Sequence, residues 1–135
     1  MDINEQYIYE DEVRDNETDL QGIVNNSNYF IYMAHTRHKH IKNLGLDFAD
    51  LHNKGYNLVV SEANIKYKSP LTAGDKYLVT CKLKPAGKIR LIFEQEVIRK
   101  SDNRKCALGT ITATCLSTAT GRPKFPDEII ELLNM

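Results

Sequence analysis

The chain has no excess of either charge and no long apolar run. Its 18 lysines and arginines balance its 18 aspartates and glutamates, whereas a dedicated nucleic-acid-binding protein normally carries a basic excess or stripe. A membrane-spanning helix needs about 20 consecutive apolar residues, and no segment meets that requirement. The first residues, Met1–Glu5, are polar and acidic, unlike a signal peptide. We therefore expect neither a nucleic acid nor a membrane as a partner.

Cysteine is scarce, and its spacing argues against a metal site. Cys81, Cys106 and Cys115 are odd in number and lack the paired spacing of metal ligands, which favours a reduced, cytoplasmic protein. Cys81 and Cys115 occupy apolar positions and are predicted to be core thiols. Ser61 lacks the Gly-x-Ser-x-Gly context of a serine hydrolase. The length of 135 residues predicts one domain, residues 1–135, with its own core.

Acidic residues are absent from residues 20–46. Within this stretch, Ser27–Leu44 carries apolar residues at helical spacing over a broad arc, which predicts a long helix mostly wrapped by a sheet. Asn26 or Ser27 is the expected N-cap, and Gly45 is expected to end the helix. With no carboxylate on this helix, any acid chemistry at its start must rest on Asp19 or on its neighbour Glu17.

Several basic side chains of the helix are assigned structural or solvent-exposed roles. Arg37 and His40 fall inside the apolar arc. Arg37 needs a carboxylate or backbone partner if it is buried, and His40 is expected to be partly buried and hydrogen-bonded. His35 and His38 share the polar side, but no acidic residue or cysteine lies near them, so we expect no metal site. His52 is expected in a loop.

Alternating apolar residues predict five strands and a short C-terminal helix. The expected strands are Gln6–Arg14, Tyr56–Tyr67, Tyr77–Leu83, Lys88–Arg99 and Cys106–Leu116, and the helix is Pro126–Leu133. Val59, Ala63, Ile65 and Tyr67 are expected on one face of Tyr56–Tyr67, which we interpret as a central strand. The order of elements predicts an α+β fold in which a curved antiparallel β-sheet wraps around one long helix.

The segment Thr18–Tyr29 holds the main candidate site. Asp19 ends a strand-like segment, Gly22 provides a turn, and the helix begins a few residues later. A carboxylate that faces the N–H groups of a helix start suits acyl transfer, because those groups can stabilise an oxyanion. Asp19 also fits an ordinary turn or capping role, and Gly22 an ordinary turn. Asn25 and Asn26 are candidates either for capping the helix or for donating to a carbonyl oxygen.

Two motifs together resemble the hotdog-fold acyl-CoA thioesterases, specifically the 4-hydroxybenzoyl-CoA thioesterase-like group. The first is Glu17–Val24, which reads Glu-Thr-Asp-Leu-Gln-Gly-Ile-Val and is followed by Asn28-Tyr29 and by Leu44-Gly45. The second is Ile65–Asp75, where a strand ends in Tyr-x-x-Pro and a Gly-Asp turn follows. The resemblance covers nearly the whole chain in order and implies a hotdog fold.

The resemblance also implies an activity and a site. Asp19 corresponds to the catalytic aspartate, as nucleophile or general base, and the backbone N–H of Asn26 corresponds to the group that polarises the thioester carbonyl. The reaction would convert acyl-CoA to a carboxylic acid and coenzyme A without a metal or other cofactor. Homodimers or homotetramers with shared active sites are implied. The candidate substrate-binding residues are Asn25, Tyr29, Glu62, Lys88 and Arg90.

Two departures from the family pattern leave other functions open. Asn26 stands where family members often have histidine, and no glutamate stands near Ala34 on the helix. An acyl-ACP thioesterase is one alternative, and a non-catalytic acyl-CoA-binding or regulatory hotdog module is another. Glu62 is predicted either to face the substrate tunnel or the dimer partner, or to lie on a solvent-exposed face of its strand. Lys88 and Arg90 are either phosphate ligands or ordinary turn residues.

Overall fold

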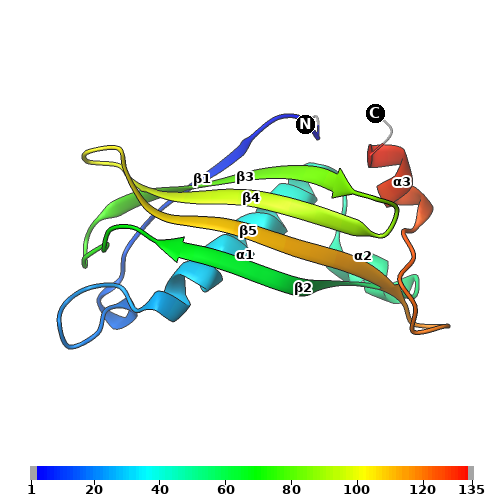
Figure 1. The fold of residues 1–135 in the computed structure, drawn as a ribbon, viewed down its shortest axis with the longest axis horizontal. Coiled ribbons are helices and arrows are strands. Elements are labelled where there is room, and N and C mark those ends of the chain that lie inside the picture. The colour runs from blue at the N-terminus through cyan, green and yellow to red at the C-terminus, as the bar shows by residue number, and fades with distance from the viewer. Residues whose placement is uncertain (1–2, 134–135) are drawn as a thin grey trace.

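The computed structural model describes residues 3–133 and contains one sheet and one long helix (Figure 1). In chain order, the elements are β1 (Tyr7–Glu12), a 3₁₀ turn (Asp15–Glu17), α1 (Asn26–Asn43), α2 (Phe48–Asn53), β2 (Tyr56–Tyr67), β3 (Lys76–Ala86), β4 (Arg90–Arg99), β5 (Arg104–Ser117) and α3 (Asp127–Leu133). The predicted α+β order of one strand, a long helix and four further strands is confirmed.

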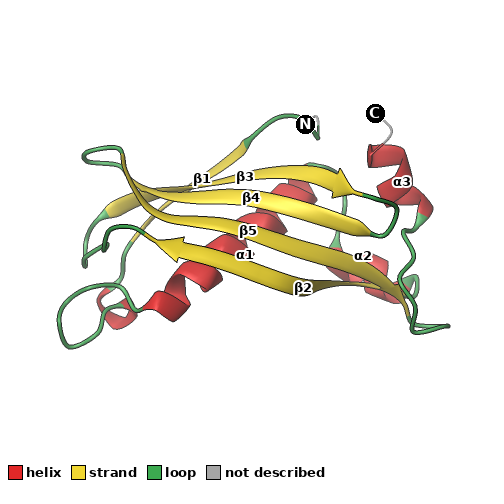
Figure 2. Ribbon diagram, viewed as in Figure 1, coloured by secondary structure: helices red, strands yellow, loops and turns green. Residues whose placement is uncertain are grey.

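All five strands form one antiparallel sheet in the order β1-β3-β4-β5-β2. Figure 2 shows this sheet as a single layer with α1 crossing behind it, and α1 packs against β1, β3 and β4. β2 lies at the edge of the sheet, so the interpretation of this segment as a central strand was wrong. Its length and apolar content resemble those of a central strand, but within residues 3–133 only β5 pairs with it.

A β-bulge in β2 changes which of its residues share a face. Val60 lies opposite Ala113, and Ala63 lies opposite Ile111, with the register shift between Val60 and Glu62. Because Ala113 and Ile111 point toward the core, Val60 accompanies Ala63 on the inner face. The prediction that placed Val59 with Ala63 was therefore wrong, since an extra residue breaks the two-residue alternation.

The core lies between α1 and the inner face of the sheet. Tyr32 of α1 stacks on Tyr77 of β3 with a ring separation of 4.5 Å. Met33 lies against Gly109 of β5, where a Cβ atom would come within 2.5 Å of the Met33 Sδ. The alternating apolar residues of β3, β4 and β5 are buried: Tyr77, Val79, Cys81, Leu83, Leu91, Phe93, Val97, Ala107, Ile111, Ala113 and Cys115. Ile89, which the same alternation predicts on this face, lies before β4 in the turn and is 40% exposed, so that prediction was wrong.

The helix ends follow the predicted chemistry with two corrections. Asn25 is the N-cap of α1, the capping role considered for it above, and its Oδ1 accepts the Ser27 N–H at 3.0 Å; the expectation that Asn26 or Ser27 caps the helix was wrong. Gly45 follows the last residues of α1 with φ of 91°, as predicted. His52 lies in α2 rather than in a loop. The six residues of α2 are too few to show a helical period, and Asp47 caps them.

Candidate active site

Asp19 lies in a tight turn between two bridged backbone segments. Thr18 pairs with Val24, and the Asp19 N–H donates to the Ile23 carbonyl at 2.8 Å. The Gly22 N–H donates back to the Asp19 carbonyl at 3.0 Å, and Gly22 has φ of 78°, a conformation that favours glycine. A Cβ atom at Gly22 would meet no described protein atom within 4 Å, so within the chain the positive φ, rather than a close contact, accounts for the glycine.

The Asp19 carboxylate is exposed and only half used. Its Oδ1 accepts the Gln21 N–H at 2.8 Å, which is the turn role considered above. Its Oδ2 makes no hydrogen bond or ion pair to any residue that the structure describes. One oxygen therefore holds the turn, and the other remains available for chemistry.

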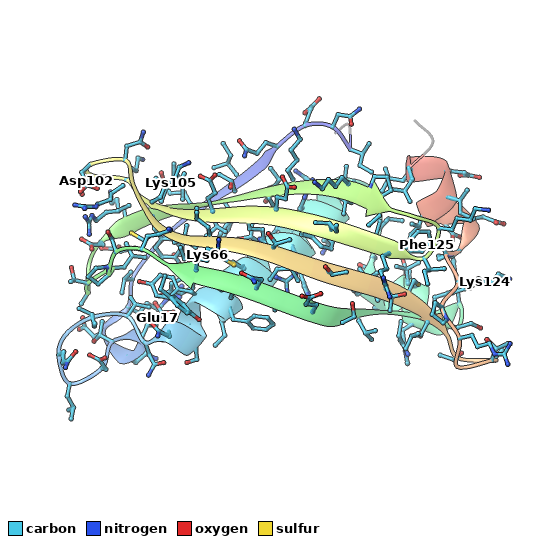
Figure 3. The ribbon with its side chains drawn as sticks, viewed as in Figure 1. Glu17, Lys66, Asp102, Lys105, Lys124 and Phe125 are labelled. Atoms are coloured by element: carbon cyan, nitrogen blue, oxygen red, sulfur yellow. The ribbon has the colours of Figure 1, made fainter. Side chains whose placement is uncertain are left out.

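The neighbouring Glu17, labelled in Figure 3, accepts structural hydrogen bonds through both its side chain and its backbone carbonyl. Its Oε1 accepts the Arg14 N–H at 2.8 Å, and its backbone carbonyl accepts from the Asn25 N–H at 3.1 Å and the Asn28 Nδ2 at 2.8 Å. These bonds tie the segment before Asp19 to the start of α1. Of the two candidate acids, Asp19 is the one with a free oxygen.

One backbone N–H at the start of α1 is unpaired. A helix leaves its first four N–H groups without helical partners. The Asn25 N–H donates to Glu17, the Ser27 N–H to the Asn25 side chain, and the Asn28 N–H to the Asn25 carbonyl. The remaining N–H belongs to Asn26, which is exposed and for which no hydrogen bond is found among the described residues. This free N–H therefore carries part of the positive partial charge at the N-terminal end of the α1 dipole.

A pocket of about 220 Å³ opens beside the Asn26 end of α1. It is lined by Ile23, Val24, Asn26, Tyr29, Tyr67, Lys68, Ser69 and Pro70. Tyr29 is buried, and its hydroxyl accepts the Leu71 N–H at 3.1 Å. Burial raises the pKa of Tyr29, which keeps the hydroxyl neutral. The ring of Tyr67, which is 48% exposed, lies 5.6 Å from the Tyr29 ring.

Tyr67, Lys68 and Pro70 were not among the site residues expected from the sequence, although they line this pocket. Their signal was the Tyr-x-x-Pro motif at the end of β2. The Tyr67 hydroxyl donates to the Asn26 carbonyl at 3.3 Å and so ties the end of β2 to the start of α1. This contact joins residues far apart in the sequence, and no spacing rule could have supplied it.

Three expected substrate-binding residues lie away from this pocket within one chain. Glu62 is exposed and paired opposite Thr112, on the face of β2 turned away from the core. Lys88 and Arg90 are exposed at the β3–β4 turn, where Lys88 lines a surface depression with Phe125. Figure 3 shows Phe125 at the opposite end of the molecule from Glu17. Of the expected site residues, Asn26 and Tyr29 line this pocket, and Asp19, Gly22 and Asn25 lie in the adjoining turn and helix cap, whereas Glu62, Lys88 and Arg90 lie elsewhere in the chain.

A second polar cluster is buried in the core and is inert. The His40 Nδ1 lies 3.2 Å from the Cys81 Sγ, and both residues are fully buried. Burial raises the pKa of the Cys81 thiol to about 12 and lowers the pKa of His40 to about 4, so both are neutral near pH 7. Cys81 is a core thiol, as predicted. His40 is fully rather than partly buried, and its Nε2 finds no partner among the described residues, contrary to expectation.

Residues 3–133 contain no cluster of three histidine, cysteine, aspartate or glutamate side chains able to hold a metal ion. Over the same residues, every helix is too short or too polar to cross a membrane.

A family model described as the thioesterase-like superfamily matches residues 13–133. A chloroplastic acyl-acyl carrier protein thioesterase of Arabidopsis thaliana is 33% identical over 87 residues, which are 64% of this chain and 46% of that protein. The chain thus spans just under half the length of this curated relative.

Solved structures share the whole fold. A hypothetical protein from Aquifex aeolicus is 27% identical, with a TM-score of 0.85 over 94% of this chain and 98% of that chain. A 1,4-dihydroxy-2-naphthoyl-CoA thioesterase from Synechocystis has a TM-score of 0.89 over 96% of both chains at 17% identity. The predicted hotdog fold and the resemblance to this group of proteins are confirmed.

Proposed function

The chain belongs to the thioesterase-like superfamily, and from this premise we propose that it hydrolyses an acyl-CoA thioester to a carboxylic acid and coenzyme A. The observation that carries the proposal is the unpaired N–H of Asn26 at the start of α1, a few residues from the free oxygen of Asp19. An oxyanion needs such a donor, and hydrolysis needs such an acceptor for a proton.

In the proposed reaction Asp19 acts as the general base. Its Oδ2 takes a proton from water while the water oxygen bonds to the thioester carbonyl carbon. The carbonyl electron pair moves onto the carbonyl oxygen, where the Asn26 N–H and the α1 dipole stabilise the charge. When the carbonyl re-forms, the C–S bond breaks and the thiolate takes the proton from Asp19.

The nucleophilic alternative uses the same residues. The Asp19 Oδ2 would bond to the carbonyl carbon, expel the thiolate and leave an anhydride that water cleaves. A single turnover in heavy-oxygen water can detect the anhydride. Label in the Asp19 carboxylate requires an anhydride that water cleaves at the Asp19 carbonyl, whereas label in the product acid alone fits either a general base or cleavage at the acyl carbonyl.

We further propose a homodimer in which two β2 strands pair at their free edges. The Glu10–Glu12 segment of β1 is acidic and would repel a second copy, whereas β2 exposes Val59, Val60 and Tyr67. A homotetramer would need a second contact between such dimers. Because the pairing is antiparallel, the β3–β4 turn of the second copy would come to the end of the molecule where α1 begins (Figure 1).

In this dimer Lys88 and Arg90 of the second copy would lie about three strand spacings, or roughly 14 Å, from the first copy's β2. This separation would allow one coenzyme A molecule to contact both places. Its thioester would lie in the pocket beside Asn26, and its phosphates would contact Lys88 and Arg90 of the second copy. Asn25 and Tyr29 would border this molecule. Glu62, on the outer face, would contact it only if the nucleotide crosses the sheet edge.

An acyl-ACP substrate is the second candidate, because the Arabidopsis relative is a thioesterase for acyl-acyl carrier protein. A cytoplasmic location is part of the main proposal, and the three buried, unpaired thiols suit a reducing compartment.

The test is release of free thiol from matched acyl-CoA and acyl-ACP thioesters. Cys81, Cys106 and Cys115 are fully buried, so the native protein contributes little thiol background of its own. Turnover of acyl-CoA supports the proposal, and faster turnover of acyl-ACP favours the second candidate. Binding of both thioesters without release would contradict hydrolysis and favour the non-catalytic module.

A further inference from the structure

Arg37 is a buried cation without an anionic partner. Its side chain lies on α1 and the residue is only 6% exposed. Its Nη1 donates to the neutral Gln95 Oε1 at 3.0 Å, and Gln95 in turn donates to the Met33 carbonyl. Two aromatic rings, those of Phe30 and Phe93, lie 5.5 and 5.9 Å from the guanidinium carbon. No carboxylate of the described residues pairs with it, although a buried charge normally requires one.

Arg37 lies on one side of α1 together with Asn26, Phe30 and Ala34. These four residues, which we call the Phe30 line, follow one another at intervals of four, four and three. The line runs about 16 Å along the helix from the unpaired N–H at Asn26 to Arg37. Phe30 is 37% exposed and Ala34 is half-buried, so the line is open to solvent until Arg37.

The Phe30 line faces the β2 edge rather than β1. The other side of α1 contacts the β1 side of the sheet, with Tyr32 stacked on Tyr77 and His35 packed on Tyr9. In the proposed dimer the line would therefore face the joint between the two copies. An acyl group attached to a thioester at Asn26 could follow the line toward Arg37.

A second copy of the chain would not supply the missing anion from the surfaces nearest this joint. α1 contains no aspartate or glutamate. The inner-face residues of β2 are Tyr56, Leu58, Val60, Ala63, Ile65 and Tyr67, none of which is acidic. Neither surface would compensate the charge of Arg37, which makes a ligand anion the source that we consider.

From this juxtaposition we infer that Arg37 binds a carboxylate at the end of the acyl group remote from the thioester. The preferred substrate class is thus an acyl thioester with a distal carboxylate, and Arg37 is a specificity-determining residue. Gln95 positions the guanidinium by accepting from Nη1. This inference rests on the proposed thioester hydrolysis and names its acyl group.

The experiment compares dodecanoyl and dodecanedioyl thioesters on whichever carrier supports turnover. These substrates have the same length and differ in the distal carboxylate. Wild type should favour dodecanedioyl in kcat/KM by about ten- to a hundredfold, the effect of a charged hydrogen bond. Arg37→Met should abolish that preference by lowering kcat/KM for dodecanedioyl far more than for dodecanoyl. Lys39→Met, which removes an exposed cation from the same helix, should retain it.

A thermal melt checks that the Arg37→Met variant is folded, and a binding titration measures the preference for a distal carboxylate without relying on turnover. Removing an unpaired buried charge should leave the Tm of Arg37→Met equal to or above that of wild type. Calorimetry on wild type should show dodecanedioate binding about tenfold or more tightly than dodecanoate. Equal affinities, or an Arg37→Met variant that loses activity equally on both thioesters, would overturn the inference. Arg37-dependent binding of dodecanedioate without hydrolysis of any thioester would instead overturn the proposed function alone.

Discussion

Asn25 accepts hydrogen bonds from the two N–H groups that follow Asn26, so the Asn26 N–H is left without a partner among the described residues. The side-chain oxygen of Asn25 caps Ser27, and its carbonyl accepts from Asn28, which leaves Asn26 as the residue with the free donor. The backbone of Asn25 has φ of −64° and ψ of 140°, the extended conformation that a residue before proline prefers. Proline is also well tolerated as the first residue of a helix.

A proline at position 26 would therefore remove the backbone N–H without disrupting α1. We expect Asn26→Pro to lower kcat by about 10²- to 10³-fold, as loss of one oxyanion donor does, with little change in stability. Asn26→Ala keeps the N–H and should retain most activity. Steady-state thiol release and thermal melts check both variants. Equal activity in the proline and alanine variants would assign no role to this N–H.

His40 is expected to make the folded state sensitive to acid. Its pKa falls from about 6.5 in the unfolded chain to about 4 in the fold because burial disfavours the charged ring. Between these values the unfolded state binds more protons, so the free energy of unfolding decreases as pH falls, by up to about 3 kcal/mol at pH 4. In urea titrations His40→Leu should weaken this dependence, whereas His35→Gln, at an exposed site, should not. Identical pH slopes in wild type and His40→Leu would rule out this origin.

At this scale the sequence predicted the Asp19 turn and the helix start well, because local spacing determines both. The Asp-x-x-Gly spacing and the missing acids after Asp19 were visible in the chain. The role of Tyr67 in the pocket was not, since its bond to Asn26 depends on where β2 ends in space. The lack of an anion beside Arg37 was not predictable either, because it depends on which side chains surround α1 in the packed structure.

At the scale of elements, β2 differs most from its prediction. Its alternation breaks at the bulge between Val60 and Glu62, and bulges leave little trace in an apolar pattern. An edge position is also invisible along one chain, because it depends on which strand pairs with which. Both features concern the strand that we propose to join two copies.

The edge proposal predicts different effects at the two edges of the sheet. Val60→Glu, at a β2 residue that is 43% exposed, should place like charges near the two-fold axis and convert the dimer to a monomer. It should also lower thiol release, because the active sites would be shared. Ile8→Glu, at a 55% exposed residue of β1, should change neither. Light scattering after size-exclusion chromatography measures the mass, and a monomeric wild type would refute the dimer.

At the scale of the whole molecule, the proposed site lies at the start of α1, and the β3–β4 turn, which carries Lys88 and Arg90, lies at the opposite end of the sheet (Figure 1). Composition and strand order were enough to predict the curved sheet around one helix. The separation of the expected residues into two groups was not predictable, because Lys88 and Arg90 would come near Asp19 only in the proposed dimer. Assembly is therefore part of the proposed function.

The most direct test of this account is thiol release by Asp19→Asn, measured beside Glu17→Gln and with thioester binding followed in parallel. We predict that Asp19→Asn binds the substrate as wild type does but loses about 10²- to 10⁴-fold in kcat, the contribution typical of a positioned base. Glu17→Gln should retain most activity, because the backbone carbonyl of Glu17 still ties the turn to α1. Undiminished kcat in Asp19→Asn would contradict the account and move the chemistry away from this turn.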